Sequence, residues 1–108
     1  MNNNFSLLFI LFMKDIYVME SDWTLITGAT STDGYQMARL LAKKGYNLVL
    51  VCNDEDRLCQ VARELNEISD IIIMPIDLSR PDGFSLLTGE CERLGLRISA
   101  LFNFFHGN

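Results

Sequence analysis

The chain has 108 residues, of which 49% are hydrophobic and 21% charged, and its formal net charge is −5. This length and composition predict a globular fold with room for one ordinary domain. Its basic residues are scattered rather than clustered, which argues against a protein that binds nucleic acid or an anionic membrane through a basic surface.

The cysteines and the single histidine give no sign of a disulfide framework or a metal site. Cys52, Cys59 and Cys91 form no CxxC pair, and we interpret them as reduced core residues in a reducing compartment. A cytoplasmic location is therefore expected. His106 has no partner at metal-ligand spacing, so no metal site is expected.

Residues 1–21 differ from the rest because FSLLFILFM, residues 5–13, is continuously apolar. A helix needs about 20 residues to span a bilayer, so this run is too short to cross one alone, and the flanking residues do not fit a signal peptide. Three interpretations stay open: an extension upstream of a true start at Met19, an apolar segment that packs on the domain, and a weak membrane tether.

Strand and helix patterns begin to alternate after this segment. WTLIT, residues 23–27, is a short apolar strand. A helical pattern follows Gly34 and stops at Gly45, the residue type that most often ends helices. NLVLVC, residues 47–52, is apolar on both faces, as is typical of a parallel strand covered by helices.

The same alternation continues to the end of the chain. Residues 54–68 have an acidic start and an apolar stripe, which predicts a second helix. IIIMPI, residues 71–76, is a strand whose Pro75 favours the edge of the sheet. A third helix is expected over residues 81–95, opening on its proline, and residues 98–105 form a fourth strand. The apolar stripe of the third helix comprises Phe84, Leu87, Cys91 and Leu94.

This order of elements predicts an α/β fold of the Rossmann type. Right-handed crossovers leave few other topologies, so we expect a parallel sheet of about four strands in the order 3-2-1-4 with helices on both faces. Residues 1–21 are then an apolar extension, and residues 22–108 form a partial, truncated Rossmann domain.

TGATSTDG, residues 27–34, occupies the first strand-to-helix turn, where free amides and the helix dipole favour a phosphate group. It is similar to the Thr-Gly-x-x-x-Gly-x-Gly turn of the short-chain dehydrogenase/reductase family. DLS, residues 77–79, and the asparagine of LFN, residues 101–103, fall where that family has an adenine-contacting Asp-Leu and an Asn-Asn-Ala-Gly segment. The resemblance spans roughly residues 22–108.

The resemblance implies an oxidoreductase that uses NAD or NADP to interconvert an alcohol and a ketone. Gly28 would make the tight turn, Gly34 would allow close helix packing, Asp77 would accept from the adenine amino group, and Asn103 would lie beside the ribose or nicotinamide. An ordinary turn at the glycines and a capping role for Asp77 remain as alternatives. The expected cofactor-binding residues are Gly28, Thr30, Ser31, Thr32, Asp33, Gly34, Asn53, Asp77, Leu78 and Asn103.

Several departures from the family pattern predict weakened cofactor binding. Thr32 occupies the middle glycine position, where a positive φ would be strained, and Asp33 brings a carboxylate close to the phosphates. Alternatively, Thr32 or Asp33 caps the helix without any ligand. Phe105 and His106 replace two small residues of the family's segment.

The sequence does not decide between NAD and NADP. An acid at the end of the second strand would favour NAD and an arginine NADP, but Cys52 and Asn53 stand there, with Asp54 one step later. The family's catalytic Tyr-x-x-x-Lys pair is also missing, so no catalytic residue is expected. Tyr35 is interpreted as a surface or packing aromatic.

We therefore expect the N-terminal, cofactor-binding half of a short-chain dehydrogenase/reductase, inactive alone. Strand 98–103 would leave an unpaired edge, which predicts self-association or a complementing C-terminal half. The alternatives are a non-catalytic Rossmann-like binding or interaction module and a decayed fragment. Nothing indicates a substrate.

Overall fold

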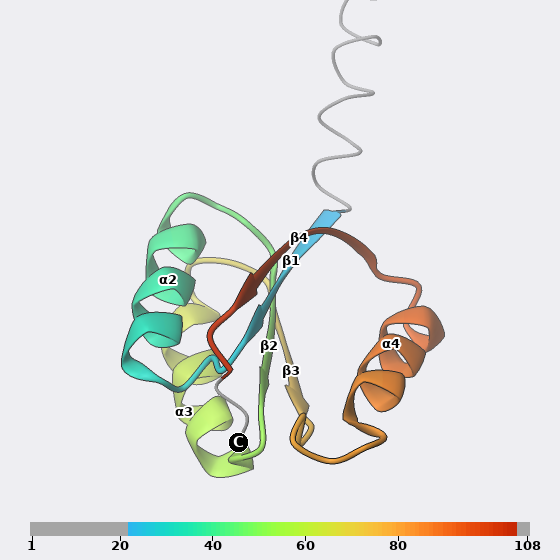
Figure 1. Cartoon of the computed structure of the whole chain (residues 1–108). Coiled ribbons are helices and arrows are strands. Elements are labelled where there is room, and N and C mark those ends of the chain that lie inside the picture. Colours follow the sequence, from blue (N-terminus) through green and yellow to red (C-terminus); the bar gives the residue numbers. More distant parts are fainter. Residues whose placement is uncertain (1–21, 106–108) are drawn as a thin grey trace, which may run out of the picture.

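The computed structural model describes residues 22–105, in which strands and helices alternate along the chain (Figure 1). The elements are β1 (Asp22–Thr27), α2 (Thr32–Lys43), β2 (Leu48–Cys52), α3 (Glu55–Leu65), β3 (Ile71–Pro75), α4 (Gly83–Arg93) and β4 (Arg97–Asn103). All strand pairs are parallel, and the sheet order is β3-β2-β1-β4. The predicted fold class and strand order are confirmed.

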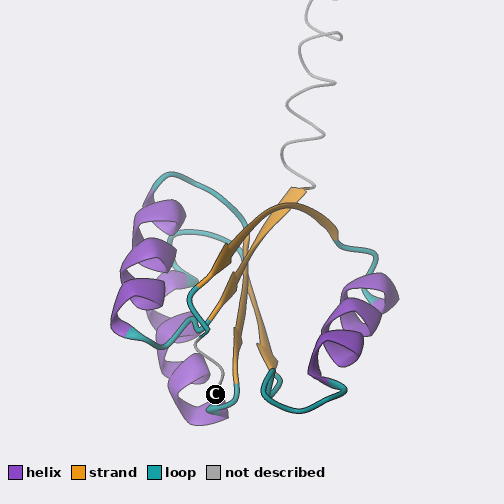
Figure 2. Ribbon diagram, in the orientation of Figure 1, coloured by secondary structure: helices purple, strands orange, loops and turns teal. Residues whose placement is uncertain are grey.

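The sheet is covered on both faces, with α2 and α3 on one side and α4 on the other (Figure 2). The central strand β2 explains this arrangement, because four of its five residues are buried and its side chains alternate between the faces. Leu48 and Leu50 belong to the cluster under α2 and α3. Val49 and Val51 belong to the cluster under α4.

Most element ends follow the sequence pattern. Gly45 and Gly95 have φ angles of +89° and +67°, so each ends its helix in the left-handed conformation that favours glycine. The Asp54 carboxylate accepts from the backbone N–H of Arg57 and caps α3. Pro75 lies in β3, which is an edge strand as predicted.

The predicted start of the third helix was wrong by two residues. Residues 80–83 form a turn in which the N–H of Gly83 donates to the Arg80 carbonyl at 3.0 Å, so α4 begins at Gly83 and not at Pro81. Its apolar stripe is only half covered: Leu87 and Cys91 are buried, whereas Phe84 is 55% exposed.

Residues 1–21 and 106–108 lie outside the described residues, so the interpretations of the N-terminal segment, of Met19 and of His106 stay predictions. Within residues 22–105, no helix combines the length and apolarity needed to cross a membrane. In the same part of the chain, no three His, Cys, Asp or Glu residues come together as metal ligands. All three cysteines are free; Cys91 is buried, and Cys52 and Cys59 are partly buried.

Candidate functional site

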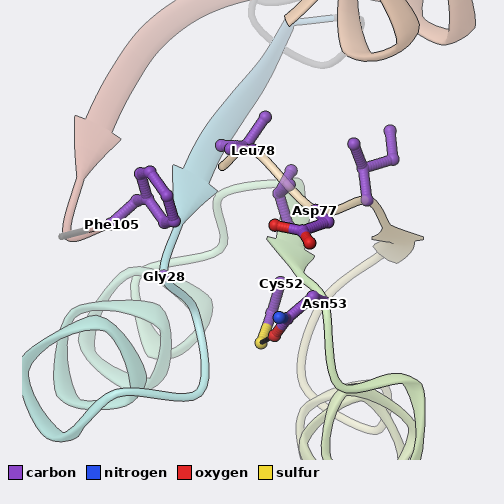
Figure 3. Close-up of a pocket in the computed structure, with 8 residues that line it drawn as sticks. Gly28, Cys52, Asn53, Asp77, Leu78 and Phe105 are labelled. Carbon is purple, nitrogen blue, oxygen red and sulfur yellow. Dashed lines mark hydrogen bonds between the residues drawn. The ribbon is translucent and has the colours of Figure 1, made fainter. Parts of the chain in front are cut away.

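A small cavity lies at the carboxyl ends of β1, β2 and β3, the edge at which ligands bind in open parallel sheets (Figure 3). Its volume is about 50 Å³. Ligand pockets usually measure roughly 300 to 1,000 Å³, so this cavity is much smaller than a typical ligand pocket. The lining residues are Gly28, Val51, Cys52, Asn53, Ile76, Asp77, Leu78 and Phe105.

The β1–α2 turn is built on two glycines that have no room for a side chain. Gly28 has a φ of +64°, and a Cβ on it would lie 2.5 Å from the carbonyl oxygen of Phe104. A Cβ on Gly34 would lie 2.1 Å from the carbonyl oxygen of Gly28. The first turn of α2 therefore packs directly on the backbone that leaves β1, as the resemblance implied.

Ser31 caps α2, and neither Thr32 nor Asp33 does, so that alternative was wrong. The Ser31 hydroxyl donates to the Gly28 carbonyl at 2.7 Å and accepts from the Gly34 N–H at 3.0 Å. Because Ser31 makes both bonds, it fixes the turn and the helix start together. Thr32 and Asp33 are the first two helical residues, and both are exposed.

Thr32 does not have the strained, positive φ that its place in the glycine pattern suggested. Among residues 22–105 only glycines have a positive φ, and Thr32 is helical. The backbone N–H groups of Thr32 and Asp33 have no partner within the helix, as is general for the first turn. They are free to donate to an anion, although the Asp33 carboxylate lies in the same turn.

The end of β2 contacts this turn through side chains. The Cys52 thiol and the Thr30 hydroxyl lie 2.9 Å apart, and Asn53 lines the cavity beside Cys52. Arg57, in the first turn of α3, donates from Nη2 to the Thr30 carbonyl at 3.4 Å. Asp54 caps α3, accepting from the Arg57 N–H at 3.1 Å.

At the end of β3, Asp77 lines the cavity and also caps the next turn. Its carboxylate accepts from the Ser79 hydroxyl at 2.6 Å and from the Ser79 N–H at 3.0 Å. These two bonds lower the pKa of Asp77 because they favour its charged form, and the bond from the Ser79 hydroxyl has the larger effect. The capping alternative thus describes the hydrogen bonds of Asp77, which also lines the cavity. Leu78 is buried next to it.

The exit of β4 closes the opposite side of the cavity. The side-chain oxygen of Asn103 accepts from the Thr27 hydroxyl and from the Phe105 N–H, the latter at 3.1 Å. The N–H of Phe104 donates to the Thr27 carbonyl at 3.0 Å. These bonds turn the chain so that Phe105 lines the cavity near Gly28 (Figure 3).

The structure brings together only part of the predicted set. The predicted residues that line the cavity are Gly28, Asn53, Asp77 and Leu78. Those that lie around the turn or the β4 exit without lining it are Thr30, Ser31, Thr32, Asp33, Gly34 and Asn103. Sequence reasoning missed the lining residues Val51 and Ile76, and it missed Arg57. For Val51 and Ile76, the strand ends were the available signal, because neighbouring carboxyl ends of parallel strands share one edge of the sheet.

Tyr35 is held on the surface as a hydrogen-bond donor. Its hydroxyl donates to the Glu64 carboxylate at 2.6 Å, and this bond is the main reason that its pKa is raised. A tyrosine that serves as a catalytic base needs a lowered pKa, so these contacts oppose such a role.

The comparisons with known proteins all point to one family. The profile of the family described as short chain dehydrogenase matches residues 22–104. A very-long-chain 3-oxoacyl-CoA reductase of Candida glabrata is 28% identical, over 87% of this chain and 31% of its own length.

Solved structures agree with the sequence match. A short-chain dehydrogenase from Sphingobium yanoikuyae in complex with NADPH is 34% identical, with a TM-score of 0.66 over 74% of this chain and 32% of its own. An alcohol dehydrogenase from the archaeon Thermococcus sibiricus, complexed with 5-hydroxy-NADP, is 31% identical, with a TM-score of 0.63 over 68% and 33%. The chain thus spans about a third of the length of these relatives. On the profile match, the sheet order and the glycine turn, the chain belongs to the short-chain dehydrogenase family.

Proposed function

We propose that residues 22–108 form the cofactor-binding part of an NAD(P)-dependent short-chain dehydrogenase. The observation that carries this proposal is the β1–α2 turn, in which Gly28 and Gly34 bring bare backbone to the edge of a cavity lined by Asn53 and Asp77. Two related structures contain NADPH or 5-hydroxy-NADP, which supports the same class of ligand here. The cofactor would supply or accept the hydride in the family's reaction.

The residues present fit the two ends of an adenosine diphosphate group. The free N–H groups of Thr32 and Asp33 suit its phosphates, and the Asp77 carboxylate suits the adenine amino group. Binding should be weaker than in intact family members because Asp33 repels the phosphates and Phe105 narrows the cavity.

Isothermal titration calorimetry of the full 108-residue chain with NAD⁺ and NADP⁺ tests the proposal. We expect saturable binding of at least one dinucleotide. A Thr32→Gly, Asp33→Ile double variant should bind more tightly, because it removes the carboxylate and lets the ligand approach the backbone. An Asp56→Ile variant, changed in the first turn of α3 and outside the cavity lining, is the matched control. Absence of saturable binding at millimolar concentrations of both dinucleotides would contradict the proposal.

We also propose that the chain does not catalyse the family's reaction alone. The sequence contains no tyrosine followed four residues later by lysine, and Tyr35 is bonded to Glu64. Mixing the chain with NADH or NADPH and common ketones should give no loss of the absorbance of the reduced cofactor. Protein-dependent oxidation would refute this part of the proposal.

The second candidate function is association through β4, with a second copy of the chain or a complementing C-terminal half. β4 is an edge strand, and Leu101 on it is 59% exposed. Sedimentation velocity should show a dimer that a Leu101→Lys variant converts to a monomer, if the partner is a second copy. A monomer at all concentrations would leave only the complementing half as the partner.

A further inference from the structure

The two edges of the sheet differ in how well they are protected against pairing with another strand. β3, the outer strand on one side, has five residues and ends at Pro75, which has no N–H to donate. β4, the outer strand on the other side, has seven residues and no proline. Its single charged residue is Arg97, at its start, and that guanidinium pairs with Asp22 of β1 at 3.2 Å. The β4 edge therefore lacks the devices that usually prevent strand addition.

The pairing of β4 with β1 shows which residues of β4 face outward. The N–H of Phe104 donates to the Thr27 carbonyl at 3.0 Å, so the backbone of Phe104 points at β1. Backbone groups alternate in direction along a strand, and the register with β1 is regular up to the end of β4. Phe102 therefore also faces β1, whereas the N–H and C=O groups of Leu101 and Asn103 point away from it. Among residues 22–105, no further strand lies on that side.

Leu101 combines this outward backbone with an exposed side chain. It lies in register with Leu25 of β1, whose side chain belongs to the cluster under α4, so Leu101 is on the same face of the sheet as α4. Its side chain is nevertheless 59% exposed. A partner strand beside β4 would bury this leucine and also satisfy the outward backbone groups.

Resting on the proposed association through β4, we propose that the partner is a second copy of this chain, paired antiparallel about a two-fold axis at Leu101. Leu101 of each copy then donates its N–H to the Leu101 carbonyl of the other, so one outward pair of groups serves both chains. On the opposite face, Phe102 of each copy lies across from Ala100 of the other, an aromatic ring beside a small side chain. Arg97 falls outside this overlap, so no like charges meet. The two sheets join into one.

The contact is small, because it joins two strand edges and two leucine side chains. Such contacts bury less than the roughly 1,200 Å² of stable complexes, so we expect weak association. Sedimentation velocity of the full chain should show the molar mass rising from one chain to two between roughly 10 µM and 1 mM.

Amide hydrogen exchange locates the contact without any substitution. The Leu101 N–H should exchange about tenfold more slowly at roughly 1 mM than at roughly 10 µM chain, because it is bonded only in the dimer. The Phe102 N–H, which faces β1, should be protected equally at both concentrations. It is the internal control, one residue away on the same strand.

Cysteine cross-linking tests the register. Residues directly opposite in a hydrogen-bonded antiparallel pair have Cα atoms about 5.5 Å apart, which suits a disulfide. Mild oxidation of Leu101→Cys with copper phenanthroline should therefore link two copies on a non-reducing gel. Leu86→Cys is the matched control, because Leu86 of α4 is 48% exposed, and it should cross-link no more than wild type. The three native cysteines, all free, set the background.

The possible failures separate this inference from the proposals on which it rests. A dimer whose Leu101 N–H exchange does not depend on concentration, or in which Leu101→Cys links no faster than Leu86→Cys, would overturn the pairing at Leu101 alone. A chain that stays monomeric at roughly 1 mM would overturn this inference and the second copy as the partner of β4. Dinucleotide binding is measured independently, so the proposed cofactor site stands or falls by its own titration.

Discussion

The turn between β1 and α2 makes a sharp prediction about Gly28→Ala. A Cβ there would lie 2.5 Å from the carbonyl carbon and oxygen of Phe104 and 2.7 Å from the N of Phe105. These are backbone atoms, so no side-chain rotation relieves the contact. The β4 exit has to move, and the bond from the Phe104 N–H to the Thr27 carbonyl, 3.0 Å long, is lost or lengthened.

The expected magnitude follows from two separable contributions. A left-handed φ costs an alanine about 1 to 2 kcal/mol, and the lost hydrogen bond costs about 1 kcal/mol, so Gly28→Ala should lower the free energy of unfolding by about 2 to 3 kcal/mol. Gly45→Ala is the matched control, because its φ is +89° and a Cβ on it meets nothing within 4 Å. It should show only the first contribution.

Urea unfolding followed by the fluorescence of Trp23 measures this difference. Trp23 is the single tryptophan and packs against the cluster under α4. Gly28→Ala should be less stable than Gly45→Ala by at least about 1 kcal/mol, or roughly 4 °C or more in the midpoint of thermal unfolding. Equal losses in the two variants would refute the argument that the β4 exit excludes a side chain at Gly28.

Three further predictions concern the same site. Gly34→Ala should destabilise the chain by about 2 kcal/mol, because its Cβ would lie 2.1 Å from a backbone oxygen. Gly89→Ala, whose Cβ would meet nothing within 4 Å, should stabilise α4 by up to about 1 kcal/mol. Equal effects of the two substitutions in urea unfolding would contradict this difference. The pKa of Asp77 is lowered in the folded protein, so its carboxylate stabilises the fold above the ordinary pKa of an aspartate, and this stabilisation is lost as the pH falls through the folded-state pKa. The difference in the free energy of unfolding between wild type and Ser79→Ala should therefore shrink below about pH 4. A difference that stays unchanged from about pH 7 to about pH 2 in urea titrations would refute the role of Ser79 in lowering this pKa. Phe105→Ala should bind NADP⁺ more tightly by calorimetry while unfolding about 1 to 2 kcal/mol more easily, because the ring both lines the cavity and is partly buried; unchanged affinity would show that the ring does not limit the site.

The fold was predictable because its signals are local. The burial of β2 on both faces, the helix stops at Gly45 and Gly95, and the edge position implied by Pro75 each depend on a few neighbouring residues. The start of α4 was missed for a local reason too. Residues 80–83 form their own turn, and that turn overrides the preference of proline for the first helical position.

The site was only partly predictable because its contacts join distant segments. Ser31, Thr32 and Asp33 are all competent N-caps, and only the fold shows that Ser31 also bonds to the Gly28 carbonyl. The bond of Arg57 to Thr30 spans 27 residues and crosses from α3 to the β1–α2 turn. No pattern in the sequence places these two residues together.

The most direct test of the proposed cofactor site is a titration of the isotope-labelled full chain with NADP⁺, followed by backbone amide chemical shifts. The account predicts saturable shifts of residues 28–34, Asn53 and Asp77, with little change at Gly45 and Gly95, which lie at the amino ends of the strands. Shifts absent at millimolar cofactor, or as large at Gly45 and Gly95 as in the turn, would contradict it.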